Sequence, residues 1–561
     1  MLAPRLLFLL ALSVVLVNAQ FVFSPGPFPF SGYNGYYSLP EQASWGDFNN
    51  DGFLDLALST AASSGPSSYF RATRLYRNNN GQGFVQVNGT GLEQLSGSTA
   101  QWGDYNNDGV LDLLIGGDWG AQLPCNSTNT LPALLYKGDG NGTFTQAFSF
   151  GKWCGLAGVW ADLNNDGWQD IILVGSTAKV NGAIPSQTSA VVWSNNKDGT
   201  FTSFPLPSAA ALGNADVCVG DYDNDGFLDL GVIGENTTGF AHTVLLHNNF
   251  RVAGNNTAPS FTVVTTTSFE NHGVGSCAWG DYNADGWLDF LLTGYQDAYS
   301  SYTESTFLWE NLQGTGFKQL NTSANGLVPM GYSTGHWGDY NNDGLPDICL
   351  MGRCNSLCPI GGGTQLYILQ NQGGNSNFYL NSTLVGTGAT GDDGTCQWGD
   401  YNNDGRLDIF AINIDFNTAL LTNHAPMKGV PPPPVTALNA SFTGSTLNIT
   451  WQRPTGVTGA LSYNVGVWGL FNSSLSFVLS PLANPLNGFR LVPAMGNAQT
   501  RLFMYLEELD QSVTYYVSVQ TVDAAFRGSL FQNITIIPPQ PTTSSARRLS
   551  AFFSPLLALL F

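Results

Sequence analysis

The sequence predicts an all-β protein, a seven-bladed β-propeller followed by a small β-sandwich. A nearly constant sixteen-residue pattern occurs seven times, and its starts lie 57 to 61 residues apart. That spacing is typical of one supersecondary unit per repeat. Each copy is followed by short apolar runs separated by Gly- and Asn-rich turns, without helical periodicity. Four expected strands in each of seven units favour a propeller over the alternative, a linear solenoid.

The repeat that begins at Trp102 shows the elements in order. A short strand ends in Trp102-Gly-Asp, a polar loop follows, and the apolar run 111–115 reads as a buried strand. We expect a third strand at 133–136 and a fourth that begins near Thr143. Residues 20–44 precede the first loop, so they can complete the last unit. The recurring Trp, replaced by Val219 in the fourth repeat, is expected to pack between units.

Each polar loop reads Asp-x-Asn/Asp-x-Asp-Gly-x-x-Asp, which predicts a calcium site. The side chains at positions 1, 3, 5 and 9 and the backbone carbonyl at position 7 can supply the oxygen ligands that Ca²⁺ prefers. Glycine at position 6 permits the sharp turn. In sequence order, positions 1, 3, 5, 7 and 9 are Asp47, Asn49, Asp51, Phe53 and Asp55; Asp104, Asn106, Asp108, Val110 and Asp112; Asp162, Asn164, Asp166, Trp168 and Asp170; Asp221, Asp223, Asp225, Phe227 and Asp229; Asp281, Asn283, Asp285, Trp287 and Asp289; Asp339, Asn341, Asp343, Leu345 and Asp347; and Asp400, Asn402, Asp404, Arg406 and Asp408.

The predicted cofactor is therefore calcium, with up to seven ions. An EF-hand is excluded because position 12 is apolar, Leu58 in the first copy and Ile115 in the second, where an EF-hand has Glu. The alternative is an acidic turn without metal, but three carboxylates within nine residues repel one another unless a cation is bound. The sequence contains no recognisable catalytic constellation, and we expect no enzyme activity.

These repeats resemble the FG-GAP or VCBS repeat family, whose seven-bladed propellers form the N-terminal head of integrin α subunits. The resemblance covers roughly residues 20–425. It implies calcium between the first two strands of each blade and a ligand on the opposite face of the propeller. An integrin's leg domains and membrane span do not follow, so we do not expect pairing with an integrin β subunit.

The region after the propeller is expected to form a second domain. Residues 426–434 include four consecutive prolines and read as a stiff linker. Period-two alternation over 435–537 predicts an antiparallel sandwich. Trp451 and the segment around Tyr515 resemble a fibronectin type III domain, with Tyr515 at the tyrosine-corner position, although 468–500 departs from that pattern. The tail, 538–561, resembles a GPI-attachment signal, the alternative being a disordered tail.

Several features predict a secreted protein or one at the outer face of the plasma membrane. Residues 1–19 read as a signal peptide, and eleven N-x-S/T sequons follow. The sequence suggests disulfides Cys354–Cys358 and Cys125–Cys154, and leaves Cys218, Cys277, Cys349 and Cys396 open between disulfides and free thiols.

The formal net charge of −21 argues against nucleic acid or an anionic membrane as partner. Three aspartates in each loop, plus Asp223, account for 22 of the 40 acidic residues. We therefore expect a calcium-binding recognition or adhesion protein that presents a rigid face to a protein or glycan. The alternative is a lectin or polysaccharide-acting enzyme on the same propeller. Candidate ligand-binding insertions are 121–129, 177–188 and 297–303.

Overall fold

The computed structural model describes residues 21–24, 43–65, 68–95, 99–116, 131–180, 184–250, 259–296, 303–320, 326–354, 363–373, 378–385, 394–413 and 418–537. These residues are almost entirely β-strand and turn, which confirms the predicted fold class; η1 (Ser208–Ala210) is a short 3-10 turn. Within the described ranges, no helix is long and apolar enough to span a membrane. The signal peptide and the tail lie outside these ranges, as do residues 121–129 and 297–302 of the candidate insertions. Of the insertion 177–188, only 181–183 lie outside, and the other residues belong to two strands that pair with each other.

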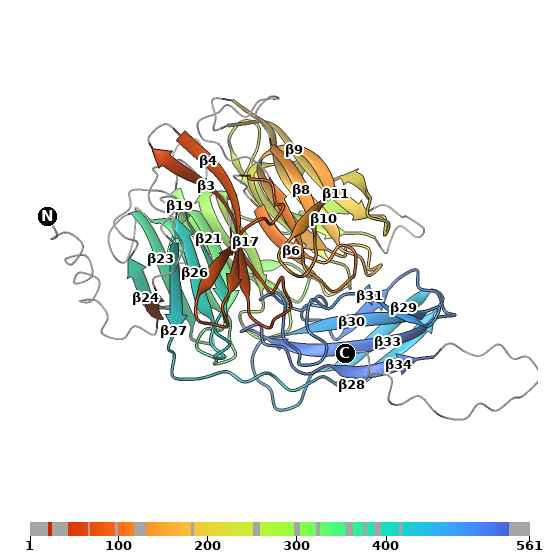
Figure 1. The fold of residues 1–561 in the computed structure, drawn as a ribbon. Coiled ribbons are helices and arrows are strands. Elements are labelled where there is room, and N and C mark those ends of the chain that lie inside the picture. Colours follow the sequence, from red (N-terminus) through yellow and green to blue (C-terminus); the bar gives the residue numbers. More distant parts are fainter. Residues whose placement is uncertain are drawn as a thin grey trace, which may run out of the picture.

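Seven four-stranded antiparallel units follow one another along the chain (Figure 1). Units 2 and 3 share the long strand β9, whose first part pairs with β8 and whose second part pairs with β10. The strands of units 1 to 3 are β2 (Ala43–Gly46), β3 (Asp55–Gly65), β4 (Ser68–Asn78) and β5 (Phe84–Val87); β6 (Thr99–Gly103), β7 (Asp112–Gly116), β8 (Leu131–Gly138) and β9 (Phe144–Ala161); and, after β9, β10 (Asp170–Val180), β11 (Ile184–Asn195) and β12 (Phe201–Pro205).

Units 4 to 7 repeat the same order of strands. They comprise β13 (Gly213–Gly220), β14 (Asp229–Glu235), β15 (Ala241–Asn248) and β16 (Phe261–Val263); β17 (Gly273–Gly280), β18 (Asp289–Gln296), β19 (Thr303–Asn311) and β20 (Phe317–Gln319); β21 (Gly331–Gly338), β22 (Asp347–Cys354), β23 (Gly363–Asn371) and β24 (Phe378–Val385); and β25 (Gly394–Gly399), β26 (Asp408–Asn413), β27 (Thr418–Asn423) and β1 (Phe21–Ser24).

The units close into a propeller-like ring. The inner strands contact one another in the order β2, β6, β9, β13, β17, β21, β25, and β25 contacts β2 again. Strand β1, from the other end of the chain, pairs antiparallel with β27, with Phe21 opposite Asn423. This pairing confirms the expectation that the segment before the first loop completes the last unit.

The hydrophobic core of the ring lies between neighbouring units, where each buried cluster draws residues from two of them. The recurring Trp fills this space, as predicted, and packs against a glycine of the preceding unit. A Cβ added to Gly220 would lie 2.6 Å from Cγ of Trp279, and one added to Gly399 would lie 2.9 Å from Nε1 of Trp45. Where the fourth unit has Val219 instead of Trp, the preceding unit has Ala161 instead of Gly. A smaller side chain on one unit thus accompanies a larger one on its neighbour.

A buried asparagine at the end of the third strand also joins adjacent units. The side-chain amide of Asn78 donates to the carbonyl of Leu54 in its own loop (2.9 Å) and to that of Tyr401 in unit 7 (2.7 Å). Unit 2 has Gly138 at this position. In the other units the side-chain amide also donates two hydrogen bonds, one to a loop of its own unit and one to a loop of a neighbouring unit. These residues are Asn195, Asn248, Asn311, Asn371 and Asn423.

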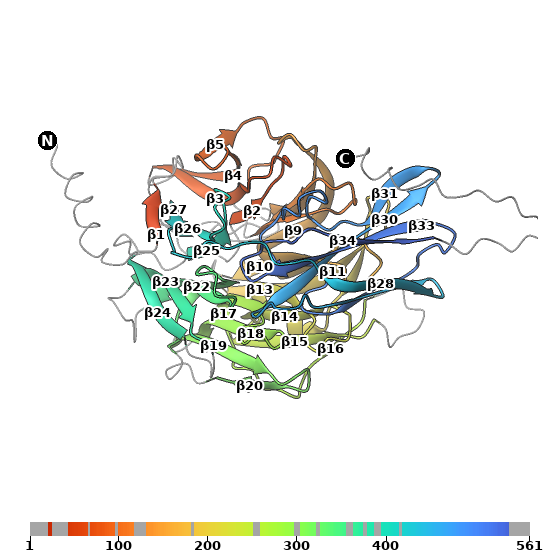
Figure 2. The ribbon, with the colours of Figure 1, turned by 90° about the horizontal axis from the view of Figure 1, so that it is seen from below.

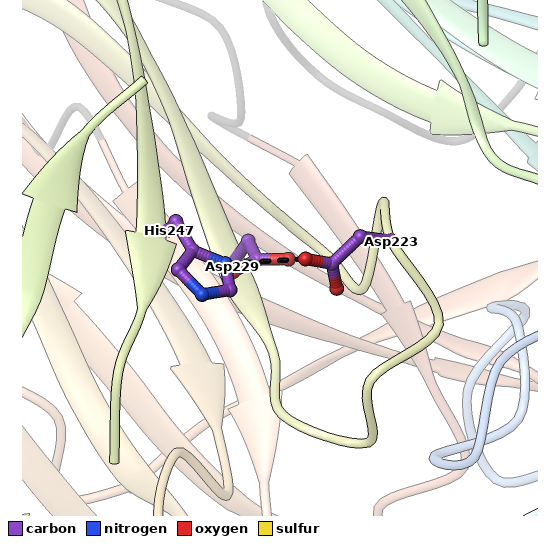
Figure 3. A group of neighbouring side chains, drawn as sticks. All are labelled: Asp223, Asp229 and His247. Atoms are coloured by element: carbon purple, nitrogen blue, oxygen red, sulfur yellow. Dashed lines mark ion pairs between the residues drawn. The ribbon is translucent and has the colours of Figure 1, made fainter. Parts of the chain in front are cut away.

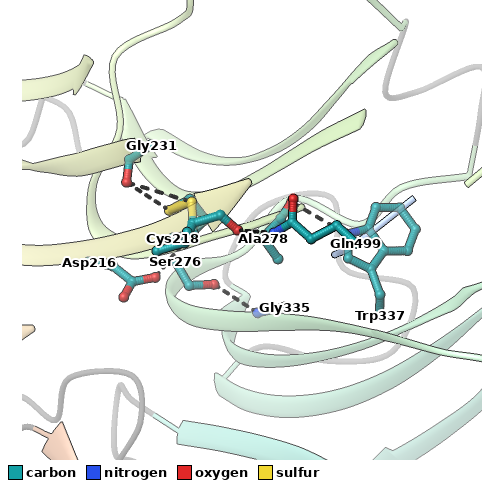
Figure 4. Close-up of a disulfide and its surroundings, with 10 residues drawn as sticks. Asp216, Cys218, Gly231, Ser276, Ala278, Gly335, Trp337 and Gln499 are labelled. Atoms are coloured by element: carbon teal, nitrogen blue, oxygen red, sulfur yellow. Dashed lines mark hydrogen bonds between the residues drawn. A yellow bond between two sulfur atoms is a disulfide. The ribbon is translucent and has the colours of Figure 1, made fainter. Parts of the chain in front are cut away.

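Within the part of the chain that the structure describes, two disulfides join units. Cys218 of β13 pairs with Cys277 of β17 (Figure 4), and Cys349 of β22 pairs with Cys396 of β25. The free-thiol alternative for these four cysteines is therefore wrong. Cys354 is also disulfide-bonded, but its predicted partner Cys358 lies outside the described residues. Cys125 lies outside them too, so the pairing predicted for it and Cys154 stays a prediction.

The C-terminal region forms a two-sheet sandwich, one sheet ordered β28-β29-β32 and the other β31-β30-β33-β34. Trp451, Tyr463 and Tyr515 lie in its core. The Tyr515 hydroxyl donates to the carbonyl of Asp510 (3.1 Å), as the tyrosine-corner interpretation expects. The strands are β28 (Thr436–Thr443), β29 (Thr446–Gln452), β30 (Leu461–Phe471), β31 (Ser474–Leu479), β32 (Phe503–Leu506), β33 (Thr514–Asp523) and β34 (Gln532–Ile536).

The sandwich lies directly against the face of the ring that carries the polar loops (Figures 1 and 2). The N–H of Asp47 donates to the carbonyl of Leu491, and the N–H of Asp339 donates to that of Ala524. The loop glycines permit this approach, since a Cβ on Gly109 would lie 2.9 Å from the ring of Phe477. The expected departure from the sandwich pattern over 468–500 is wrong for its first part, because 468–471 and 474–479 lie in strands β30 and β31. The stretch 480–502 is irregular and makes contacts with the ring, such as those of Leu491 and Gln499. The sequence did not predict this docking.

Candidate metal sites

The structure places each predicted ligand set in the hairpin between the first and second strands of its unit. Among the described residues, three acidic or histidine ligand atoms lie within 4.8 Å of one another only in the fourth loop. In the first loop, the N–H of Asp51 donates to Oδ1 of Asp47 (3.0 Å) and to Oδ1 of Asn49 (2.9 Å). The N–H of Gly52 donates to Oδ2 of Asp47 (2.8 Å), and that of Phe53 to Oδ1 of Asp51 (3.0 Å). The other six loops repeat these bonds between equivalent positions.

Two positions of each loop adopt the left-handed conformation. Position 6 is always glycine, as predicted, for example Gly52 with φ +87°. Position 4 is left-handed as well, which the sequence reasoning missed; it is Asn50 (φ +56°) in the first loop and Ala284 (φ +59°) in the fifth. Asparagine tolerates this conformation better than most residues. The Asn403 amide also donates to the carbonyl of Gly52 in the adjacent loop (2.6 Å). The recurrence of Asn at position 4 was the available signal.

The aspartate at position 9 connects each loop to the third strand of its unit. Oδ1 of Asp55 accepts from the N–H of Asn78 (2.7 Å), and Oδ2 accepts from the N–H of Phe48 (3.2 Å). The bond from the third strand is made in all seven units. In the seventh loop, Oδ2 of Asp408 is buried without any hydrogen-bond partner. A buried carboxylate oxygen without a partner is costly, and a bound cation would satisfy it.

Burial makes these loops electrostatically unfavourable without a cation. Asp55 and Asp112 are fully buried. Desolvation, together with repulsion from the other loop aspartates, raises the pKa of each to about 8. The same causes raise the pKa of Asp289 and of Asp408 to about 9. At neutral pH such a loop must hold a proton on these carboxyls or bind a cation.

The donor set fits calcium. Every predicted side-chain ligand is a carboxylate or an amide oxygen, and these are hard donors gathered within one nine-residue turn. When bound, Ca²⁺ would neutralise the crowded carboxylates; Asp47, Asn49, Asp51, the Phe53 carbonyl and Asp55 would hold it in the first loop. Position 5 lies nearer the surface in every loop but the third, where Asp166 is buried; Lys137 pairs with Asp108 (2.7 Å) and Arg406 with Asp404 (3.1 Å). Exposed pairs of this kind contribute little to stability.

The fourth loop differs from the other six. It has Asp223 at position 3, where the others have Asn. Nδ1 of His247, on β15, lies 3.3 Å from Oδ1 of Asp229 and 3.4 Å from Oδ2 of Asp223 (Figure 3). On the other side, Nε of Arg501, from the C-terminal sandwich, lies 3.3 Å from Oδ2 of Asp221. The sequence reasoning found neither His247 nor Arg501, because both are distant from the loop along the chain.

Comparison with known proteins supports the repeat interpretation. Residues 47–115 and 162–232 match the family described as FG-GAP-like repeat. Both stretches contain predicted loops and the strands around them. The chain therefore contains FG-GAP-like repeats. A search of curated protein sequences gives no significant match.

Several solved structures are similar to this chain at low identity. A fungal alcohol oxidase of the AA5 family in complex with copper is 12% identical, covers 90% of this chain and 100% of its own, and has a TM-score of 0.41. Rhamnogalacturonan lyase PL11 from Bacillus licheniformis is 13% identical, with coverages of 73% and 76% and a TM-score of 0.38. An exotype rhamnogalacturonan lyase is 13% identical, with coverages of 88% and 85% and a TM-score of 0.33.

Proposed function

We propose that this chain is a calcium-binding extracellular recognition or adhesion protein, built as a seven-bladed FG-GAP propeller with a fibronectin type III-like domain. One observation carries the proposal: every unit places a buried aspartate at position 9 of the hairpin and a second aspartate at position 1, which is buried in six units and half-buried in the seventh, at Asp400. Calcium at up to seven such hairpins would remove the repulsion among them and hold the first, second and third strands of each unit together. The role of calcium is thus structural.

The docked sandwich indicates which face of the ring is available to a ligand. It lies on the face that carries the predicted calcium loops, and its N-terminal linker contacts the seventh loop through the N–H of Gly429 and the carbonyl of Gly405. Turns between second and third strands lie at the opposite end of the strands. In unit 4 this turn is 236–240, and Phe240 on it is half exposed. We propose that a protein or glycan ligand binds at that opposite face.

The fibronectin-like assignment of the sandwich rests on its strand order and on Tyr515. A three-stranded sheet packed on a four-stranded sheet, with a tyrosine hydroxyl bonded to a nearby backbone carbonyl, is typical of that class. An extracellular location is supported by the two disulfides between units. We propose secretion or a GPI anchor, recognition without catalysis, and no pairing with an integrin β subunit.

The test measures calcium and ligand binding on the full chain. Metal analysis after dialysis against calcium should give a content that approaches one ion per loop, and the melting temperature should fall in EDTA. The double variant Asp104→Asn, Asp112→Asn should lose about one calcium per chain. Asp198→Asn, at an exposed turn outside the loops, is the matched control and should lose none. A wild-type protein without calcium, with an unchanged melting temperature in EDTA, would refute the calcium role.

Protein and glycan arrays, probed with and without chelator, test recognition. Calcium-dependent binding to a protein without glycan binding supports adhesion. Retention on glycans that survives removal of the protein's own glycans supports the lectin alternative, and turnover of a polysaccharide supports the enzyme alternative.

A further inference from the structure

The fourth loop gathers a set of ligand atoms that includes nitrogen. Asp223 on the loop, Asp229 at the start of β14 and His247 on β15 converge (Figure 3), and one ligand atom from each lies within 4.8 Å of the others. The remaining six units have Arg77, Lys137, Ser194, Glu310, Gln370 and Thr422 at the position of His247. An imidazole therefore faces the loop in unit 4 alone of the seven.

The distances in this cluster suit a small divalent transition metal. Zinc binds imidazole nitrogen and carboxylate oxygen at about 2.0–2.2 Å, so two such ligands at a tetrahedral angle lie about 3.3–3.5 Å apart. Nδ1 of His247 lies 3.3 Å from one carboxylate and 3.4 Å from the other. It is buried and makes no hydrogen bond to either. The nitrogen thus lies where a metal ligand would lie and, when the ring is protonated, pairs with both carboxylates instead.

The C-terminal sandwich weakens the calcium set of the same loop. The Arg501 guanidinium is buried against Asp221, both side chains being 1% exposed, with Nε 3.3 Å from Oδ2. A permanent positive charge at position 1 opposes a second cation bound there. The side-chain carbonyl of Gln499, also from the sandwich, accepts from the N–H of Asp221 (2.7 Å), and the Gln499 amide donates to the carbonyl of Val219 (3.3 Å). These bonds hold Asp221 in place. Asp223, Asp225 and Asp229 have no basic partner from the sandwich, and of these Asp223 and Asp229 face His247.

We propose that the fourth loop binds a divalent transition-metal cation such as Zn²⁺ through Asp223, Asp229 and Nδ1 of His247, in preference to calcium. The proposal rests on the proposed function in that it treats the loops as cation sites. Imidazole nitrogen favours zinc and related ions, whereas calcium takes oxygen ligands. The six loops with only oxygen ligands keep calcium.

The experiment titrates Zn²⁺ into the EDTA-stripped full-length protein in the presence of millimolar calcium, by calorimetry, and counts both metals after dialysis. Wild type should retain one zinc per chain. His247→Gln should weaken zinc binding at least about tenfold, and Asp223→Asn, which restores the residue of the other loops, should do the same. His247→Ser, which copies Ser194 of unit 3, is a second variant in case the first does not fold.

The control is His242→Gln, because His242 lies on the same strand and its ring contacts the side-chain amide of Asn236 (2.8 Å) outside the cluster. It should bind zinc as wild type does. Absence of zinc from wild type, or equal zinc binding by the His247 variants, would overturn the proposal and leave a protonated His247 as the counter-charge of the loop. Calcium counts in the same samples report separately on the other six loops.

Discussion

Gly220 and Trp279 allow a double-mutant test of how neighbouring units pack. A methyl group on Gly220 would lie 2.6 Å from Cγ and 2.7 Å from Cδ1 of Trp279, far inside contact distance. Gly220→Ala should therefore cost about 1–3 kcal/mol of unfolding free energy through overpacking. Trp279→Val should cost about 2–4 kcal/mol, because it removes a buried ring. It breaks no hydrogen bond, since Nε1 of Trp279 has no partner.

Combining the two changes copies the Ala161 and Val219 pair that joins units 3 and 4. With the ring gone, the new methyl has space, so the double variant should cost about as much as Trp279→Val alone. That corresponds to a coupling energy of about 1–3 kcal/mol. Urea unfolding in saturating calcium measures all three variants, with an unchanged m-value as the check on comparable unfolding. If the free-energy costs of the two single substitutions were strictly additive in the double variant, contact with the Trp279 ring would not be the reason for glycine at position 220.

Two further predictions concern the ring closure and the loops. Asn78→Ala removes two bonds to carbonyls and one from the N–H of Gly81 (2.8 Å), so it should cost about 3 kcal/mol at about 1 kcal/mol each; the exposed Asn79→Ala is its control, and equal effects in urea unfolding would contradict the role of Asn78. The pKa of Asp55 and of Asp112 is raised from 3.8 to about 8 in the folded chain. The calcium-free fold then binds more protons than the unfolded chain between about pH 4 and pH 8, so its stability in EDTA should fall as pH rises through that window. Calcium binds the deprotonated form, so the melting-temperature difference between calcium and EDTA should widen from about pH 5 to about pH 8; a constant difference would contradict this linkage.

The part of each candidate metal site that could be predicted consists of residues that lie close together in the sequence. Asp47, Asn49, Asp51 and Asp55 lie within nine residues, so the turn chemistry alone brings them together. The same reasoning located the glycine at position 6, but not the left-handed Asn50, because asparagine is common in loops for several reasons. Strand order followed from the repeat period, and β1 was placed in unit 7 because the seventh repeat lacked a fourth strand.

By itself, the sequence determined the all-β class and the FG-GAP-like repeats, and it predicted the loop ligands and the second domain, since each depends on residues close together in the chain. Only the tertiary structure decided the disulfide pairs, the asparagine bonds between units, the docking of the sandwich on the loop face, and the approach of His247 and Arg501 to the fourth loop. These contacts join residues tens to hundreds of positions apart. Which residues meet depends on how whole sheets pack against one another, and the periodicity along the chain does not determine that packing.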